Sequence, residues 1–161
     1  MKYILLKGAS HAGKSTTMDA VCKMLKPDHI QRLNPTAKTV EDIDGIYEMF
    51  NGSFILEVNG VIILVAAGAT TEQGVTITML VKIAIALKIR IDFAIVSMRS
   101  YETKDGFNTP TELNSLGECI GTFVVHKIRG DDFRNAEQWK TRVQGIVTLL
   151  EEHGVVTSNL V

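Results

Sequence analysis

Two glycines, Gly8 and Gly13, lie between an apolar run and a helix-forming segment, and this arrangement constrains the fold more than any other feature. The apolar run, residues 3–6 (YILL), is typical of a buried strand. Good helix formers recur from about residue 13 to residue 26, and Pro27 ends that helix. A strand that enters a helix through a glycine-rich loop predicts an α/β fold.

The rest of the chain continues this alternation. Two apolar runs within residues 53–68 flank Asn59-Gly60 and predict a hairpin. Residues 27–52 are interpreted as a long connection with a short helix near residues 40–50. Further strands are expected at 92–97 and 122–128, and helices at 75–90, 111–120 and 136–153. We therefore expect a single domain over residues 1–161 with a three-layer α/β/α fold, whose sheet is mostly parallel with one antiparallel hairpin strand.

The composition limits which partners and which cellular locations are expected for the protein. The 161 residues carry a net charge of −1, so no broad basic surface is expected for nucleic acid or for an anionic membrane. No stretch of about 18 apolar residues predicts a membrane span, and no leader peptide is expected at the N-terminus. Cys22 and Cys119 lack metal-binding spacing. Reduced thiols and a cytoplasmic location are therefore predicted.

The segment Gly8-Ala9-Ser10-His11-Ala12-Gly13-Lys14-Ser15 fits the pattern G-x-x-x-x-G-K-[ST]. At these residues, between a strand and a helix, the chain resembles the P-loop NTPase superfamily. The resemblance implies a loop whose backbone N–H groups surround a phosphate at the positive end of a helix. It also implies binding of a nucleoside triphosphate, ATP or GTP, with Mg²⁺. The residues expected to contact the nucleotide are Gly8, Ala9, Ser10, His11, Ala12, Gly13, Lys14, Ser15 and Thr16.

Individual side chains of this loop have expected roles. The resemblance implies that Lys14 reaches the β- and γ-phosphates, that the Ser15 hydroxyl is a ligand of Mg²⁺, and that Thr16 lies near the α-phosphate. Lys14 is expected to be accessible to solvent, since it pairs with phosphate and not with the core. The side chain of His11 could reach solvent or a substrate.

The acidic residue that P-loop enzymes usually carry at the end of a neighbouring strand is missing. The strand 61–65 is the natural candidate for that neighbour, and it continues into Ala66-Ala67-Gly68 without an Asp or Glu. Glu72, four residues beyond Gly68, is the first candidate to replace the missing acidic residue. Glu57 is interpreted as a solvent-facing residue of an edge strand, and Asp92 as a cap at the opposite end of the sheet.

The order of elements loosely resembles that of small Ras-like GTPases, but two of their motifs are degenerate. Their D-x-x-G corresponds to Val65–Gly68, where only the glycine matches. Their guanine-binding N-K-x-D corresponds to residues 126–129, where only Lys127 matches and Arg129 replaces the carboxylate. A preference for adenine, or no preference, is therefore expected over guanine.

Further candidates lie outside the loop. Arg99 and Lys104 follow the strand 92–97 and could form a basic lid over phosphates; a solvated loop is the alternative. The histidines at positions 29, 126 and 153 show no metal-binding spacing. The helix 75–90 is apolar over much of its circumference, so it is either fully buried or part of a homodimer interface.

Three functional classes remain open. The first is a Mg²⁺-dependent NTP hydrolase, with Lys14, Glu72 and Arg99 as its catalytic candidates. The second is a small-molecule kinase whose acceptor binds residues 27–52 and 98–110. The third is a nucleotide-dependent binding module without hydrolysis, which the missing acidic residue favours.

Overall fold

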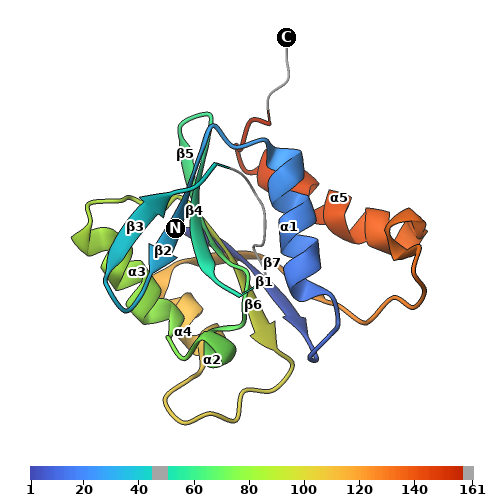
Figure 1. The fold of residues 1–161 in the computed structure, drawn as a ribbon, viewed down its shortest axis with the longest axis horizontal. Helices are drawn as coiled ribbons and strands as arrows, with labels where there is room; N and C mark the ends of the chain where they lie inside the picture. Colours follow the sequence, from blue (N-terminus) through green and yellow to red (C-terminus); the bar gives the residue numbers. More distant parts are fainter. Residues whose placement is uncertain (45–50, 158–161) are drawn as a thin grey trace.

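The computed structural model describes residues 1–44 and 51–157, which form a seven-stranded mixed sheet and five α-helices (Figure 1). The strands are β1 (Lys2–Gly8), β2 (His29–Asn34), β3 (Thr39–Asp42), β4 (Ser53–Val58), β5 (Val61–Ala66), β6 (Phe93–Arg99) and β7 (Glu118–Val124). The helices are α1 (Lys14–Leu25), α2 (Thr70–Gln73), α3 (Ile77–Ala86), α4 (Thr109–Leu116) and α5 (Glu137–Glu152), with a 3₁₀ turn at Phe133–Asn135.

The strand order is β3-β2-β4-β5-β6-β1-β7, and it corrects two expectations. The pairs β5–β6, β6–β1 and β1–β7 are parallel, whereas β4–β5, β2–β4 and β2–β3 are antiparallel. The prediction of a mostly parallel sheet was wrong because the presumed connection 27–52 supplies β2 and β3. In addition, β6 lies between β5 and β1, so β5 is not the direct neighbour of the strand that enters the glycine loop.

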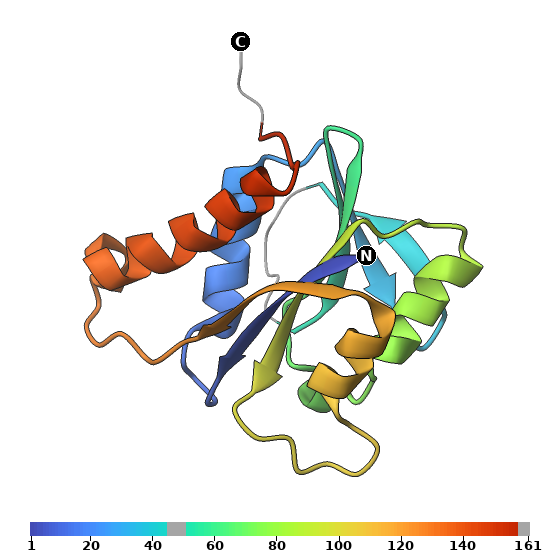
Figure 2. The same cartoon turned by 180° about the vertical axis from the view of Figure 1, so that it is seen from behind.

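Helices cover both faces of the sheet, as Figures 1 and 2 show from opposite sides. On one face α1 and α5 pack through residues such as Met18, Val21 and Ile146. On the other face α3 and α4 pack through Ile77, Leu80 and Leu113. Side chains of the buried strands alternate between these two clusters, as expected from the period of two residues in a strand.

Most other elements lie near their predicted places. The hairpin turn is confirmed, with Asn59 at φ 47° and Gly60 at φ 83°, the left-handed pair that a tight two-residue turn requires. The strand predicted at 122–128 begins four residues earlier, at Glu118. The short helix expected near 40–50 is contradicted at 40–42, which belong to β3; residues 45–50 lie outside the described part.

The helix predicted over 75–90 is shorter, and only one of its sides is buried. Ile77, Leu80 and Ile83 pack against the sheet, whereas Met79 and Ile85 are 42% and 64% exposed. Of the two alternatives for this helix, full burial is therefore contradicted, and the homodimer interface stays a prediction. Within residues 1–44 and 51–157, no helix combines the length and the apolar character needed to cross a membrane.

Candidate functional site

The loop between β1 and α1 is held in shape by close packing and by left-handed backbone angles. A Cβ atom on Gly8 would lie 2.9 Å from both Cγ2 and the carbonyl oxygen of Val125, so only glycine fits there. Gly13 has φ 90° and His11 has φ 63°, and the N–H of Ala12 donates to the carbonyl of Ala9 (3.2 Å). The motif therefore requires its two glycines for different reasons. Gly8 permits close packing against Val125, and Gly13 permits the left-handed backbone angle.

Lys14 begins α1 and lies inside the loop. Its Nζ donates to the carbonyl oxygens of Gly8 (2.7 Å) and Ala9 (2.8 Å). The residue is only 7% exposed, so the expectation that it is solvent-accessible was wrong. Burial lowers the pKa of its ammonium group; the nearby Glu72 carboxylate opposes that shift and Arg99 adds to it.

The first turn of α1 offers donors without a competing anion. Gly13 occupies the N-cap position, so no side chain caps the helix, and the first turn holds no acidic residue. Such a helix start carries the positive end of the helix dipole, and its N–H groups point toward the loop. The Ser15 hydroxyl donates to the carbonyl of Ala67 (3.2 Å), which follows β5. The loop therefore approaches the end of β5 although β6 lies between the two strands.

Glu72 and Arg99 meet beside this loop. Arg99 is the last residue of β6, and its Nε donates to Oε1 of Glu72 in α2 (2.8 Å). Their side chains are 38% (Glu72) and 42% (Arg99) exposed, so the ion pair is open to solvent. Because both charges act on the pKa of Lys14, the structure brings together the three residues that the sequence analysis proposed as catalytic.

Hydrogen bonds fix α2, and with it Glu72, to the segment that follows β6. The hydroxyls of Thr70 and Thr109 are 3.0 Å apart, and both are fully buried. Thr109 in turn donates its N–H (2.6 Å) and its hydroxyl (2.5 Å) to the carboxylate of Glu102. Lys104, which was predicted with Arg99 as part of a basic lid, lies over the ring of Phe107, with Nζ 5.2 Å from the ring centroid.

A site for Mg²⁺ would have few protein ligands. Val65, at the position that the D-x-x-G pattern would give to an aspartate, is fully buried in the cluster beneath α1 and α5. In the described part of the chain, no group of three or more His, Cys, Asp or Glu side chains could hold a metal ion. Side-chain oxygens in this region include the Ser15 hydroxyl, which binds the Ala67 carbonyl, and the Glu72 carboxylate, which binds Arg99. A Mg²⁺ ion bound there would have to keep several waters and take phosphate oxygens as ligands, because few protein oxygens are at hand.

A cavity of about 350 Å³ opens beside the loop. On one side it is lined by His11, Gly13 and Thr16. On the other it is lined by Lys127, which matches the lysine of N-K-x-D, and by four residues without an expected role: Asp131, Phe133, Trp139 and Arg142. The ring of Phe133 packs edge-on against Trp139, with centroids 5.0 Å apart. Arg129 is absent from the lining of this cavity.

Arg142 of α5 contacts both the glycine loop and the segment that follows β7. Its Nη2 donates to the carbonyl of His126 (2.6 Å), and its Nη1 lies 3.4 Å from the carbonyl of Ala12. Burial lowers the pKa of this guanidinium. A sequence signal existed: Arg142 lies three residues after Trp139 and four before Ile146, so it interrupts the apolar face of a helix.

Other predicted residues lie elsewhere. Glu57 is half-buried on β4, which has neighbours on both sides, so the interpretation as an edge strand was wrong. Asp92 lies at the amino end of β6, where its Oδ2 accepts from the N–H of Ile62 (2.9 Å). It is therefore a cap at the opposite end of the sheet, as the sequence predicted.

A larger groove of about 830 Å³ is bounded by β2, β3, the start of β4 and Gln73. Gln73 connects the groove to the end of β5, since its Nε2 donates to the carbonyl of Gly68 (2.6 Å) and its Oε1 accepts from the Ser53 hydroxyl (3.0 Å).

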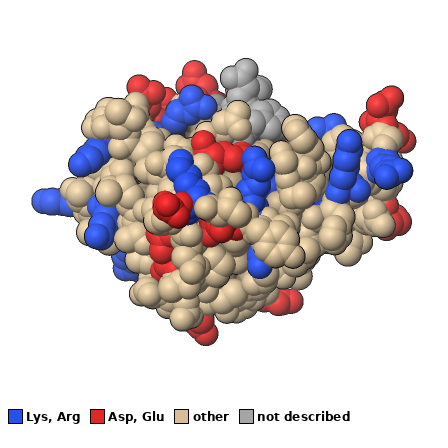
Figure 3. Space-filling model, turned by 90° about the horizontal axis from the view of Figure 1, so that it is seen from below, with Lys and Arg blue, Asp and Glu red and all other residues tan. Residues whose placement is uncertain are grey.

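Figure 3 views the molecule from the end of the sheet at which β1 and β6 finish. Basic and acidic side chains lie side by side over the middle of this face.

Comparison with known proteins adds no assignment: no family model, no curated protein and no solved structure matches this chain.

Proposed function

We propose that this chain is a P-loop protein that binds a nucleoside triphosphate, with ATP the favoured nucleotide, and hydrolyses it with Mg²⁺. The observation that carries the proposal is the buried Lys14, whose Nζ is held by the carbonyls of Gly8 and Ala9 inside an uncapped helix entrance. A buried ammonium bound only to neutral carbonyls is poorly compensated. A phosphate that replaces those carbonyls supplies the missing negative charge.

The residues around Lys14 have distinct roles in this proposal. The N–H groups of the loop and of the first turn of α1 bind phosphate oxygens. Ser15 would hold Mg²⁺, which would supply charge neutralisation for the transferred phosphoryl group. Glu72 orients the attacking water once Arg99 leaves it to contact phosphate. The cavity lined by Thr16, Lys127 and Trp139 receives the nucleoside.

Isothermal titration calorimetry with ATP and Mg²⁺ tests this proposal. We expect Lys14→Ala to weaken binding at least about 100-fold, because the loop loses its only buried charge for phosphate. Lys23→Ala is the matched control, since it removes an exposed lysine from the same helix and should bind as the wild type does. Circular dichroism checks that both variants remain folded. Undiminished binding by a folded Lys14→Ala variant would refute the proposal.

A kinase is the second candidate, and the groove of about 830 Å³ favours it. Most of the lining of that groove, residues 32–35, 41, 51 and 52, falls within the segment 27–52 predicted to bind an acceptor, and Gln73 connects the groove to Gly68. Nucleotide turnover that requires an added acceptor would support the kinase. Turnover in its absence would support the hydrolase, and binding without turnover in either assay would support the non-hydrolysing module.

A further inference from the structure

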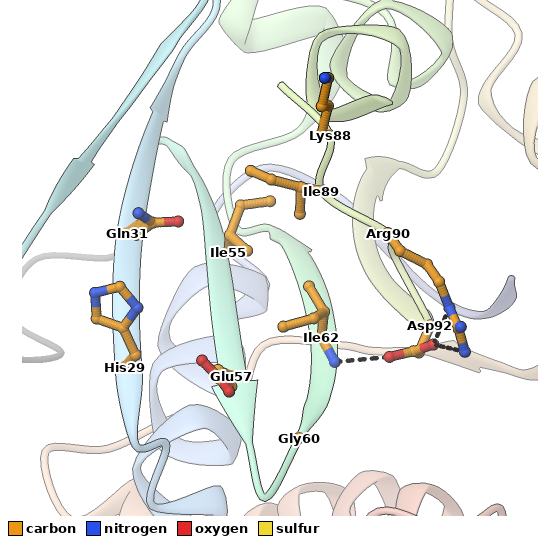
Figure 4. A pocket seen from close by; sticks show the side chains of 10 residues that line it. All are labelled: His29, Gln31, Ile55, Glu57, Gly60, Ile62, Lys88, Ile89, Arg90 and Asp92. Atoms are coloured by element: carbon orange, nitrogen blue, oxygen red, sulfur yellow. Dashed lines mark hydrogen bonds and ion pairs between the residues drawn. The ribbon is translucent and has the colours of Figure 1, made fainter. Parts of the chain in front are cut away.

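A further pocket, of about 430 Å³, lies at the end of the sheet opposite to the loop (Figure 4). One wall is formed by β2 and β4, and the other by the segment between α3 and β6. Three isoleucines from these walls form an apolar floor: Ile55, Ile62 and Ile89. Such a surface accommodates an aliphatic chain.

Three polar side chains on the strands adjoin this floor because of strand register. His29 pairs directly with Glu57 across β2 and β4, and Glu57 pairs with Ile62 across β4 and β5. In the next row Gln31 pairs with Ile55. Side chains in paired positions lie on the same face of a sheet. His29, Gln31 and Glu57 therefore present their polar groups at one side of the apolar floor, as Figure 4 shows.

Asp42 of β3 determines which atoms of two of these side chains face the pocket. Its Oδ1 lies 2.9 Å from His29 Nε2 and 3.0 Å from Gln31 Nε2. The hydrogen bonds with Gln31 and His29 hold the pKa of Asp42 below its ordinary value, so the carboxylate is ionised and can only accept. Both nitrogens therefore donate to Asp42. Oε1 of Gln31 is then an acceptor, and Nδ1 of His29 is an acceptor in the tautomer whose single ring proton is on Nε2.

Glu57 adds a negative charge to these acceptors. Its half-buried carboxylate has no hydrogen-bond or ion-pair partner among residues 1–44 and 51–157. The basic groups of the opposite wall do not compensate it: Arg90 binds Asp92 (3.1 and 3.2 Å), and Lys88 points away from the floor in Figure 4. A carboxylate without a protein partner at the wall of a pocket is an acceptor open to a ligand that enters it. Proteins retain such features where a ligand supplies the partner.

We propose that this pocket binds a primary aliphatic amine as its ammonium ion. The three N–H groups of an ammonium match the three acceptors, which are the Glu57 carboxylate, His29 Nδ1 and Gln31 Oε1. The carbon chain lies along Ile55, Ile62 and Ile89. The site is separate from the loop at Gly8–Ser15 and does not depend on the function proposed for that loop.

NMR titration of the full chain with n-pentylamine tests the proposal. We expect the amide signals of His29, Glu57 and Ile62 to shift, with a Kd on the order of 1 mM for so small a ligand. 1-Pentanol and pentanoate share the carbon chain but lack the cation, and each should bind at least about tenfold more weakly. Equal binding of 1-pentanol would overturn the proposal, and this comparison requires no variant.

Two variants and one control locate the acceptors. Glu57→Gln should weaken n-pentylamine binding at least about tenfold, with an unchanged or raised Tm because an unpaired charge is removed. Asp42→Ala, an exposed change, should weaken it at least about threefold by releasing His29 and Gln31. Glu118→Gln, on β7, should bind as the wild type does. Undiminished binding by Glu57→Gln would refute the site, and undiminished binding by Asp42→Ala would refute the role of Asp42.

Discussion

The two ends of the sheet carry candidate sites of opposite construction. At the carboxyl end of β1, consecutive residues 8–15 form a loop whose backbone and single lysine present positive charge. At the other end, His29, Gln31, Asp42 and Glu57 come from three strands and present acceptors. A site built from consecutive backbone groups leaves a motif in the sequence. A site built from paired strand positions leaves none, because its spacing depends on the register of the sheet.

The first and largest expected effect concerns the end with the motif. Val65→Asp should lower the free energy of unfolding by roughly 4 kcal/mol, because it buries an unpaired carboxylate in the cluster beneath α1 and α5. Urea denaturation measures this, and Val65→Thr is the control, with an expected loss of roughly 1–2 kcal/mol. A stable Val65→Asp variant with tighter Mg²⁺-dependent nucleotide binding would instead show that position 65 faces the metal.

The second prediction concerns turnover at the same end. Single-turnover phosphate release should be slow, below the roughly 1–100 s⁻¹ of kinases, because no carboxylate follows β5 directly. Glu72→Gln should slow release about 100-fold and leave ATP affinity nearly unchanged, since it removes a water-orienting group. Glu152→Gln, near the end of α5, is the control. Fast release without Mg²⁺ that is insensitive to Glu72→Gln would contradict both the metal and the role of Glu72.

A smaller effect is expected for the nucleobase. ATP should bind as tightly as GTP or more tightly, because the position of the guanine-reading carboxylate holds Arg129. The cavity nevertheless presents the carboxylate of Asp131, so Asp131→Ala should weaken either nucleotide by less than about tenfold. Competition binding with both nucleotides measures this. A preference for GTP of about tenfold or more, roughly 1.4 kcal/mol, would show that Asp131 serves as that carboxylate.

The smallest effect concerns the end without a motif. The pKa of Asp42 is held below the ordinary 3.8 in the folded protein. Its contribution to stability is therefore present above that value and is lost as the pH falls through the folded-state pKa. Asp42→Asn should flatten the loss of stability between about pH 5 and pH 2. Urea denaturation at a series of pH values measures the slope, and Asp105→Asn, in the loop after β6, should leave it unchanged. An unchanged slope in Asp42→Asn would show that the bonds with His29 and Gln31 do not favour its ionised form.

The local parts of the fold followed from the sequence alone. Asn59-Gly60 predicted the hairpin because few residues adopt left-handed backbone angles at low cost. The helices α1 and α5 followed from their apolar period and from Pro27 and Gly154 near their ends. The strands β2 and β3 were missed because residues 29–42 hold only a few apolar side chains, and pairing with β4 completes their stability.

Of the candidate site too, one part was predictable from the sequence and another part depends on the tertiary structure. The glycine loop and the place of Lys14 in it were predictable because the hydrogen bonds of Lys14 Nζ join near neighbours in the chain, Gly8 and Ala9. Only the tertiary structure buried Lys14, placed β6 between β5 and β1, and brought Arg142 behind the loop. It also gathered His29, Gln31 and Glu57 on one face of the sheet. Each of these depends on which strands and helices become neighbours, and that order is set by the packing of the whole core and not by any local pattern.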